Sequence, residues 1–235
     1  MKYKKVLLKL SGESLQGNKS SALDEDRLNH FAREIRSVHE KGVRIAVVIG
    51  GGNIFRGLKG TSQGISRVQG DYMGMLATLI NSLALQQALE TLGVSTCVLS
   101  ALKTESVAEK ITSRRVNQAL ENGQVAILAG GTGNPFFTTD SAAVLRALEI
   151  HADIILKGTR VDGIYSADPE TDQKAVRYDG ISFDEALKKG LKIMDLTAFT
   201  LCRDNHLPLI VFNANAEGNL IRILMGEKIG TLVHM

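Results

Sequence analysis

Short apolar segments alternate with longer amphipathic segments along the whole chain. The apolar segments are five to seven residues long and rich in β-branched residues, which is typical of strands buried on both faces of a parallel sheet. We predict strands at residues 5–10, 43–49, 94–99, 124–129, 152–156 and 209–213.

Helices are predicted between these strands. Residues 24–41 carry apolar side chains three and four positions apart, which places them on one stripe of a helix. Residues 71–92 and 107–122 each end at a glycine, the usual residue after a helix C-terminus, and Ser182 with Glu185 forms a capping box. The predicted helices span residues 24–41, 71–92, 107–122, 141–150 and 182–190.

Alternating strands and helices favour right-handed βαβ units. We therefore predict an α/β fold, a three-layer αβα sandwich with a mainly parallel central sheet. Residues 160–180 interrupt the alternation and are expected to form a hairpin or loop outside the sheet. Because no linker or repeat is visible, a single domain over residues 1–235 is expected.

Composition narrows the class of protein. Of the 235 residues, 44% are hydrophobic and 23% charged, which is ordinary for a globular protein. No apolar run approaches the ~20 residues of a membrane span, and the first apolar stretch is too short for a signal peptide. A net charge of +3 with 5% aromatic residues argues against nucleic-acid binding. Two distant cysteines give neither a disulfide framework nor metal-ligand spacing, so a cytoplasmic protein without membrane or nucleic-acid partners is expected.

Glycine is the unusual residue, with 23 in the chain against three prolines. Glycine-rich loops follow three predicted strands, at residues 9–12, 50–57 and 130–140. In an open α/β sheet ligands bind beyond the carboxyl ends of the strands, where backbone N–H groups and helix N-termini attract anions. The loops therefore predict a crevice that binds several phosphates.

Two known phosphate-binding motifs match only partly. Residues 12–20 resemble a Walker A loop with one extra residue before the lysine, which displaces the ammonium from the phosphates. The run Gly50-Gly51-Gly52 lacks the third glycine of a dinucleotide-binding fingerprint. Both motifs are disfavoured.

Phosphoryl transfer is the chemistry that the charged residues near these loops favour, since it requires positioning and charge neutralisation more than covalent catalysis. Lys9 and Lys157 end predicted strands, and Asp140 opens a predicted helix. No histidine lies in the glycine-rich loops. A phosphate acceptor needs no general base because it is already anionic, so a phosphate is favoured over an alcohol.

Five segments together resemble the bacterial uridylate (UMP) kinase family of the amino-acid kinase superfamily, and the resemblance covers essentially the whole chain. They are KLSGE at 9–13, VIGGGNIFRG at 48–57, GDYMGMLAT at 70–78, GTGNPFFTTD at 131–140 and VDGIYSADP at 161–169. The resemblance implies the reaction UMP + ATP → UDP + ADP with Mg²⁺ held mainly through the nucleotide phosphates rather than by metal-ligating residues. It also implies a homohexamer inhibited by UTP.

The resemblance further implies roles for individual residues, with UMP mainly on residues 1–150 and ATP mainly on residues 151–235. The expected catalytic residues are Lys9, Asp140, Lys157 and Asp195. The expected UMP-binding residues are Gly51, Asp71, Thr132, Gly133, Asn134, Pro135, Phe136, Phe137, Thr138 and Thr139. The expected ATP-binding residues are Lys9, Leu10, Ser11, Gly12, Gly52, Arg56, Thr159, Tyr165 and Asp168.

One segment departs from the family. Members often carry Gly-x-x-Gly-(Phe/Tyr)-Gly-(Ile/Leu)-Asp after the first loop, associated with activation by GTP. Residues 17–24 keep the first glycine, the leucine and the aspartate but lack the later glycines and the aromatic residue. The departure argues against activation by GTP.

Simpler interpretations stay open for several residues. Asp71 and Asp140 would each suit a helix N-cap, and Lys157 would suit a solvated strand end. A protein that stores or senses a nucleotide or oxyanion on the same fold, without turnover, is the alternative function. The presence of Lys9, Asp140 and Asp168 argues against it, since such a protein needs no transfer machinery.

Overall fold

A nine-stranded sheet organises the part of the chain that the computed structural model describes, residues 1–17, 21–56, 64–167, 169, 171–172 and 174–235. Its order is β4-β3-β5-β2-β1-β6-β8-β9-β7. The strands are β1 Lys5–Leu10, β2 Arg44–Ile49, β3 Thr96–Ser100, β4 Glu109–Lys110, β5 Val125–Ala129, β6 Ile154–Thr159, β7 Gly180–Ser182, β8 Leu209–Asn213 and β9 Thr231–His234. Neighbouring strands pair in parallel except β9, which runs antiparallel to β8.

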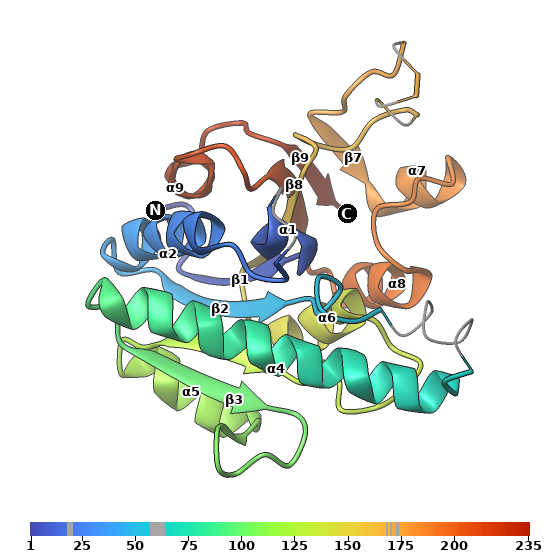
Figure 1. Cartoon of the computed structure of the whole chain (residues 1–235). Helices are drawn as coiled ribbons and strands as arrows, with labels where there is room; N and C mark the ends of the chain where they lie inside the picture. Colours follow the sequence, from blue (N-terminus) through green and yellow to red (C-terminus); the bar gives the residue numbers. More distant parts are fainter. Residues whose placement is uncertain (18–20, 57–63, 168, 170, 173) are drawn as a thin grey trace.

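Helices cover both faces of the sheet, which confirms the three-layer α/β fold (Figure 1). The helices are α1 Glu13–Gln16, α2 Glu25–His39, α4 Arg67–Thr91, α5 Ser113–Glu121, α6 Thr139–Glu149, α7 Phe183–Lys188, α8 Leu196–Asp204 and α9 Asn219–Met225. Side chains of β1 alternate between the faces: Val6, Leu8 and Leu10 pack with α2, α4 and α9, while Leu7 packs with α5 to α8. All are buried, so the sheet is doubly covered as predicted.

The predicted strands all form, whereas two helix boundaries are wrong. The predicted helix 107–122 begins only at Ser113, because Thr112 accepts a hydrogen bond from the Arg115 N–H (3.1 Å) and caps the helix. The residues before it include the edge strand β4. The predicted helix 71–92 begins earlier, at Arg67, where the Ser66 hydroxyl accepts from the Gln69 N–H at 3.3 Å.

The described residues between 160 and 180 form the expected hairpin-like excursion. The Ser166 N–H donates to the Val176 carbonyl (3.0 Å), and the Tyr178 N–H donates to the Ile164 carbonyl (2.8 Å). The strand β7 that follows, and β9 beside it, were not predicted.

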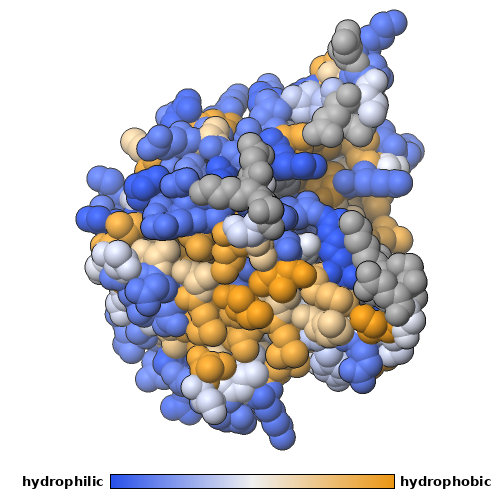
Figure 2. Space-filling view, viewed as in Figure 1, coloured by the Kyte–Doolittle hydropathy of each residue, from blue (hydrophilic) through white to orange (hydrophobic). Residues whose placement is uncertain are grey.

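α4 is the longest helix, and one of its sides is apolar and exposed. Met73, Leu76 and Ile80 are 40, 48 and 49% exposed, and Figure 2 shows apolar side chains gathered where α4 crosses the front of the molecule. Among the described residues no helix combines the length and apolar character needed to cross a membrane.

The fold brings the glycine-rich loops to one edge of the sheet. β5, β2, β1 and β6 are adjacent and parallel, so their carboxyl ends point the same way. The described residues of the three glycine-rich loops, 9–12, 50–56 and 130–140, follow these ends, as the sequence predicted.

Candidate active site

Two lysines and one aspartate form an ion cluster at this edge. Lys9 on β1 and Lys157 on β6 are register partners. The Nζ atom of Lys9 lies 2.6 Å from Oδ1 of Asp140, and Nζ of Lys157 donates to Oδ2 at 2.5 Å. Each lysine is only 9% exposed, so the suggestion that Lys157 is a solvated strand end is wrong.

Burial and charge compete at Asp140. Burial alone would raise the pKa of Asp140, but the ammonium groups of Lys9 and Lys157 outweigh burial and hold this pKa below its ordinary value. Burial lowers the pKa of Lys157, and the neighbouring Lys9 lowers it further, against the opposing carboxylates of Asp140 and Asp195. The cluster therefore keeps an ionised aspartate between two cations with little water present.

Asp195 lies beside this cluster and connects two helix N-termini. It is the N-cap of α8, accepting from the Ala198 N–H at 2.9 Å. Its carboxylate also accepts hydrogen bonds from the hydroxyls of Thr138 and Ser141. Thr138 in turn caps α6 by accepting from the Asp140 N–H at 3.0 Å. The cap of α6 is thus Thr138, and the interpretation of Asp140 as the N-cap is wrong.

A first cavity, of about 530 Å³, opens between α4 and the glycine loops; we call it the α4 cavity. Its lining includes many of the residues expected to bind UMP, namely Gly51, Asp71, Thr132, Asn134, Phe137, Thr138 and Thr139. Gly133, Pro135 and Phe136 belong to the same loop but not to the lining. Gly52 and Arg56, expected at ATP, line this cavity as well, and Arg56 pairs with Glu13.

Asp71 enters the α4 cavity from the second turn of α4 rather than from its N-cap. Its carboxylate accepts from Nε of Arg67 at 2.9 and 2.8 Å, and from the Phe136 N–H at 2.7 Å. The Arg67 guanidinium also lies over the Phe136 ring, 5.6 Å from its centroid. The N-cap interpretation of Asp71 is therefore wrong, since Ser66 has that role.

Buried polar side chains of α4 hold the glycine loops in place. The Thr78 hydroxyl accepts from the Gly130 N–H at 2.8 Å, and the Asn81 amide donates to the Gly50 carbonyl at 2.7 Å. A Cβ on Gly12 would lie 2.5 Å from the Gly50 carbonyl oxygen, so the first two loops touch only because Gly12 has no side chain.

A second cavity, of about 520 Å³, lies beyond β6; we call it the β6 cavity. Apolar side chains line much of it, among them Ile164, Leu191 and Ile193. Two residues expected at ATP, Thr159 and Tyr165, are also in the lining. Lysine side chains, Lys189 and Lys192, complete the wall.

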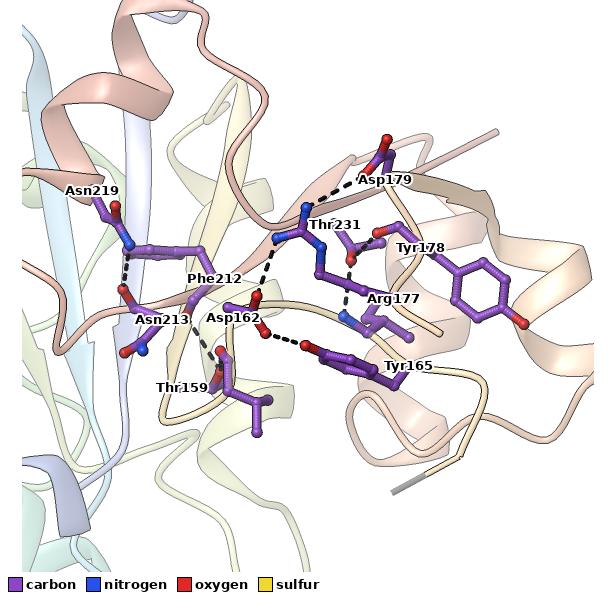
Figure 3. A network of polar contacts seen from close by, with 12 residues as sticks. Thr159, Asp162, Tyr165, Arg177, Tyr178, Asp179, Phe212, Asn213, Asn219 and Thr231 are labelled. Carbon is purple, nitrogen blue, oxygen red and sulfur yellow. Dashed lines mark hydrogen bonds and ion pairs between the residues drawn. The ribbon is translucent and has the colours of Figure 1, made fainter. Parts of the chain in front are cut away.

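A polar network fixes the wall of the β6 cavity (Figure 3). Asp162 accepts from the Tyr165 hydroxyl at 2.5 Å and pairs with Arg177 at 3.2 Å. The fully buried Thr231 hydroxyl accepts from the Ile164 N–H at 2.8 Å and donates to the Tyr178 carbonyl. β9 thereby holds both arms of the hairpin, and the hairpin presents Tyr165 to the cavity.

Two members of the ion cluster are close neighbours of cavity-lining residues along the chain. Asp140 directly follows Thr139 of the α4 cavity, and Lys157 precedes Thr159 of the β6 cavity by two residues on the same strand. Ser11 and Gly12 follow β1 at this point, while Leu10, also expected at ATP, is fully buried in the core. Asp168 lies outside the described residues.

Some residues of the site were missed by the sequence analysis. Arg67, Thr78, Asn81 and Ser141 are each hydrogen-bonded to a predicted site residue or to a glycine loop. Two of them had a sequence signal: Arg67 stands four residues before Asp71 on a helix, and Thr78 ends the segment GDYMGMLAT that carries the family resemblance.

Comparisons with known proteins agree with this arrangement. The model of the amino acid kinase family matches residues 4–213. A uridylate kinase of Bacteroides thetaiotaomicron is 55% identical over 233 residues, covering 99% of each chain. The solved UMP kinase of Bacillus anthracis superposes with a TM-score of 0.97 at 38% identity, over 100% of this chain and 97% of that one. The solved UMP kinase of Ureaplasma parvum superposes with a TM-score of 0.94 at 40% identity, over 100% of both chains. The chain therefore belongs to the amino acid kinase family and, within it, to the bacterial uridylate kinases.

Proposed function

We propose that this chain transfers the γ-phosphoryl group of ATP to UMP, giving UDP and ADP. The observation that carries the proposal is the Lys9–Asp140–Lys157 cluster at the carboxyl ends of β1 and β6, whose sequence neighbours Thr139 and Thr159 line the α4 cavity and the β6 cavity. Two nucleotides bound in these cavities would bring their phosphates together at the two ammonium groups. The name shared by the relatives, uridylate or UMP kinase, supports UMP as the acceptor.

The protein's share of the reaction is electrostatic. In phosphoryl transfer negative charge is spread over the oxygens of the transferring group, so fixed cations stabilise the transition state. Lys9 and Lys157 supply those cations, and Asp140 pairs with both and holds them in place while they are buried. The attacking oxygen belongs to a phosphate, so no side chain has to remove a proton.

ATP is assigned to the β6 cavity and UMP to the α4 cavity. The apolar walls around Ile164 and Ile193 suit a planar base, and Thr159 and Tyr165 lie beside it. Asp71 in the α4 cavity suits the ribose hydroxyls, which are donors to a carboxylate. Arg56 and the N-terminus of α6 contribute positive charge for phosphates.

Mg²⁺ is expected to accompany ATP. Within the described part of the chain no group of three or more His, Cys, Asp or Glu side chains is arranged to hold a metal ion. The carboxylates at this site, Asp140 and Asp195, already accept hydrogen bonds or ion pairs. These residues fit a Mg²⁺ held mainly by nucleotide phosphates and water, its common coordination beside phosphates, where it neutralises phosphate charge.

A homohexamer is part of the proposal, and the exposed side of α4 supports it. Met73, Leu76 and Ile80 form an apolar strip of the kind that marks protein interfaces. A second copy of this chain would cover it. Replacing Leu76 and Ile80 with Asp should dissociate the assembly, measured as sedimentation mass, whereas replacing the exposed Lys41 should not; an unchanged mass would exclude this side of α4.

Regulation and location are proposed from the family alone. UTP is expected to inhibit as the end product, and GTP is not expected to activate because residues 17–24 lack the family's later glycines and its aromatic residue. Residues 18–20 lie outside the described residues. The enzyme is expected in the cytoplasm.

A coupled assay of ADP formation with UMP, CMP and dCMP as acceptors tests the function directly. We expect turnover with UMP and little with the cytidine nucleotides. Binding of ATP without turnover of any acceptor would instead support a storage or sensor protein.

A further inference from the structure

Arg67 makes contacts that an ordinary helix-surface arginine does not need. It lines the α4 cavity, and its Nε atom donates to both carboxylate oxygens of Asp71 at 2.9 and 2.8 Å. The Asp71 side chain is only 12% exposed, while Arg67 is 34% exposed. The pair therefore joins a half-exposed cation to a nearly buried carboxylate at the cavity wall.

The same arginine also contacts the glycine-rich loop at residues 130–140. Its guanidinium lies 5.6 Å from the centre of the Phe136 ring. The Phe136 N–H donates to Oδ2 of Asp71 at 2.7 Å, and Phe136 has a φ of 72°. A non-glycine residue adopts this conformation only where its surroundings hold it. Arg67 and Asp71 together supply those surroundings.

A second Arg–carboxylate pair with the same spacing, Arg36 and Glu40, allows a comparison with the Arg67–Asp71 pair. Arg36 of α2 and Glu40, the residue that caps the C-terminus of α2, have the same four-residue spacing and a 2.6 Å contact. They are 44 and 55% exposed and line no described cavity. Such surface pairs contribute little to stability. Both pairs share the four-residue spacing. Of the two arginines, Arg67 is the one that lines a cavity and contacts an aromatic ring of a loop.

We propose that Arg67 is a positioning residue for the acceptor nucleotide, holding the Asp71 carboxylate and the Phe136 loop in the arrangement that receives the ribose. This inference rests on the proposed function, in which Asp71 accepts from the ribose hydroxyls of UMP. A planar guanidinium can donate to the carboxylate and stack on the ring at once, which an ammonium cannot do. Arg67 therefore acts through Asp71 rather than on the phosphates.

The test compares UMP with dUMP, which lacks the 2′-hydroxyl, in the wild type, R67Q, R67K and the control R36Q. We expect R67Q to raise KM for UMP about tenfold with kcat changed less than about threefold, since only ground-state orientation is lost. The preference for UMP over dUMP in kcat/KM should fall about fivefold, because a misplaced carboxylate no longer distinguishes the diol. R67K should recover part of the loss, and R36Q should match the wild type.

A double-mutant cycle with D71N separates positioning from direct binding. If Arg67 acts through Asp71, adding R67Q to D71N changes KM for UMP less than about twofold. Additive losses, or equal losses for UMP and dUMP, would mean that Arg67 contacts the nucleotide itself and would overturn the proposal. A wild type that leaves UMP unphosphorylated overturns the proposed function and this inference together. An active wild type with R67Q equal to R36Q overturns this inference alone.

Discussion

Two carboxylates in this protein are each held by basic side chains, and their surroundings differ sharply. Asp140 lies between two lysines that are each 9% exposed, on strands at the centre of the sheet. Asp71 pairs with a half-exposed arginine on one helix and with a loop at the cavity wall. The first arrangement is rigid and dry, which suits transition-state stabilisation. The second can adjust to a ligand, so we expect it to govern affinity.

Replacing Asp140 with Asn should have the largest effect. Two buried ammonium groups would then lack their common counter-ion, and we expect kcat to fall at least about a hundredfold and stability to fall by about 3 kcal/mol. Steady-state kinetics and urea unfolding would measure both. Asp184, an exposed carboxylate on α7, supplies the control D184N, which should change neither quantity. A D140N enzyme with near-normal kcat would remove Asp140 from the mechanism.

Replacing Lys9 with Met should have the next largest effect and should separate rate from affinity. Asp140 keeps Lys157 as a partner, so the fold should persist. We expect kcat and kcat/KM for ATP to fall together by about tenfold to a hundredfold, the pattern of an interaction made mainly in the transition state. The exposed Lys41 gives the control K41M. A rise in KM at constant kcat would place Lys9 in ground-state binding, the role we assign to the Asp71 side of the site.

The smallest expected effect is a shift in pH dependence. Burial and Lys9 lower the pKa of Lys157 from 10.5, so kcat should decline at a lower pH than an ordinary lysine would give as Lys157 loses its proton. The Asp195 carboxylate has the opposite effect: it favours the charged form of Lys157 and so raises the pKa of Lys157. In D195N the decline should therefore move to still lower pH, measured as kcat at saturating substrates over the alkaline range. A decline that moves upward would contradict this electrostatic account.

The sequence predicted the central strands because a parallel strand buried on both faces is a continuous apolar run. β4 and β7 were not predicted, because strands of two and three residues are too short to contain such an apolar run. β9 was not predicted either, because it pairs with β8 and β7, and these contacts between distant segments leave no local sequence pattern. The loops were predicted to converge because parallel strands share one edge, and they do.

Individual roles were harder to predict where they depend on tertiary contacts. Asp71 and Asp140 suited an N-cap locally, but Ser66 and Thr138 take those positions. Asp195 meets Thr138 across 57 residues of sequence. Arg67 was not predicted. An Arg–Asp pair four residues apart usually lies on a solvated surface, and only the fold shows that this pair borders a cavity.

The most direct measurement is the product balance of the purified chain with ATP, Mg²⁺ and UMP, followed by ³¹P NMR in the wild type and in D140N. The account predicts that the wild type forms UDP and ADP in equal amounts and that D140N forms almost none under the same conditions. ATP that stays intact beside UMP in the wild type, or equal UDP formation by both proteins, would contradict it.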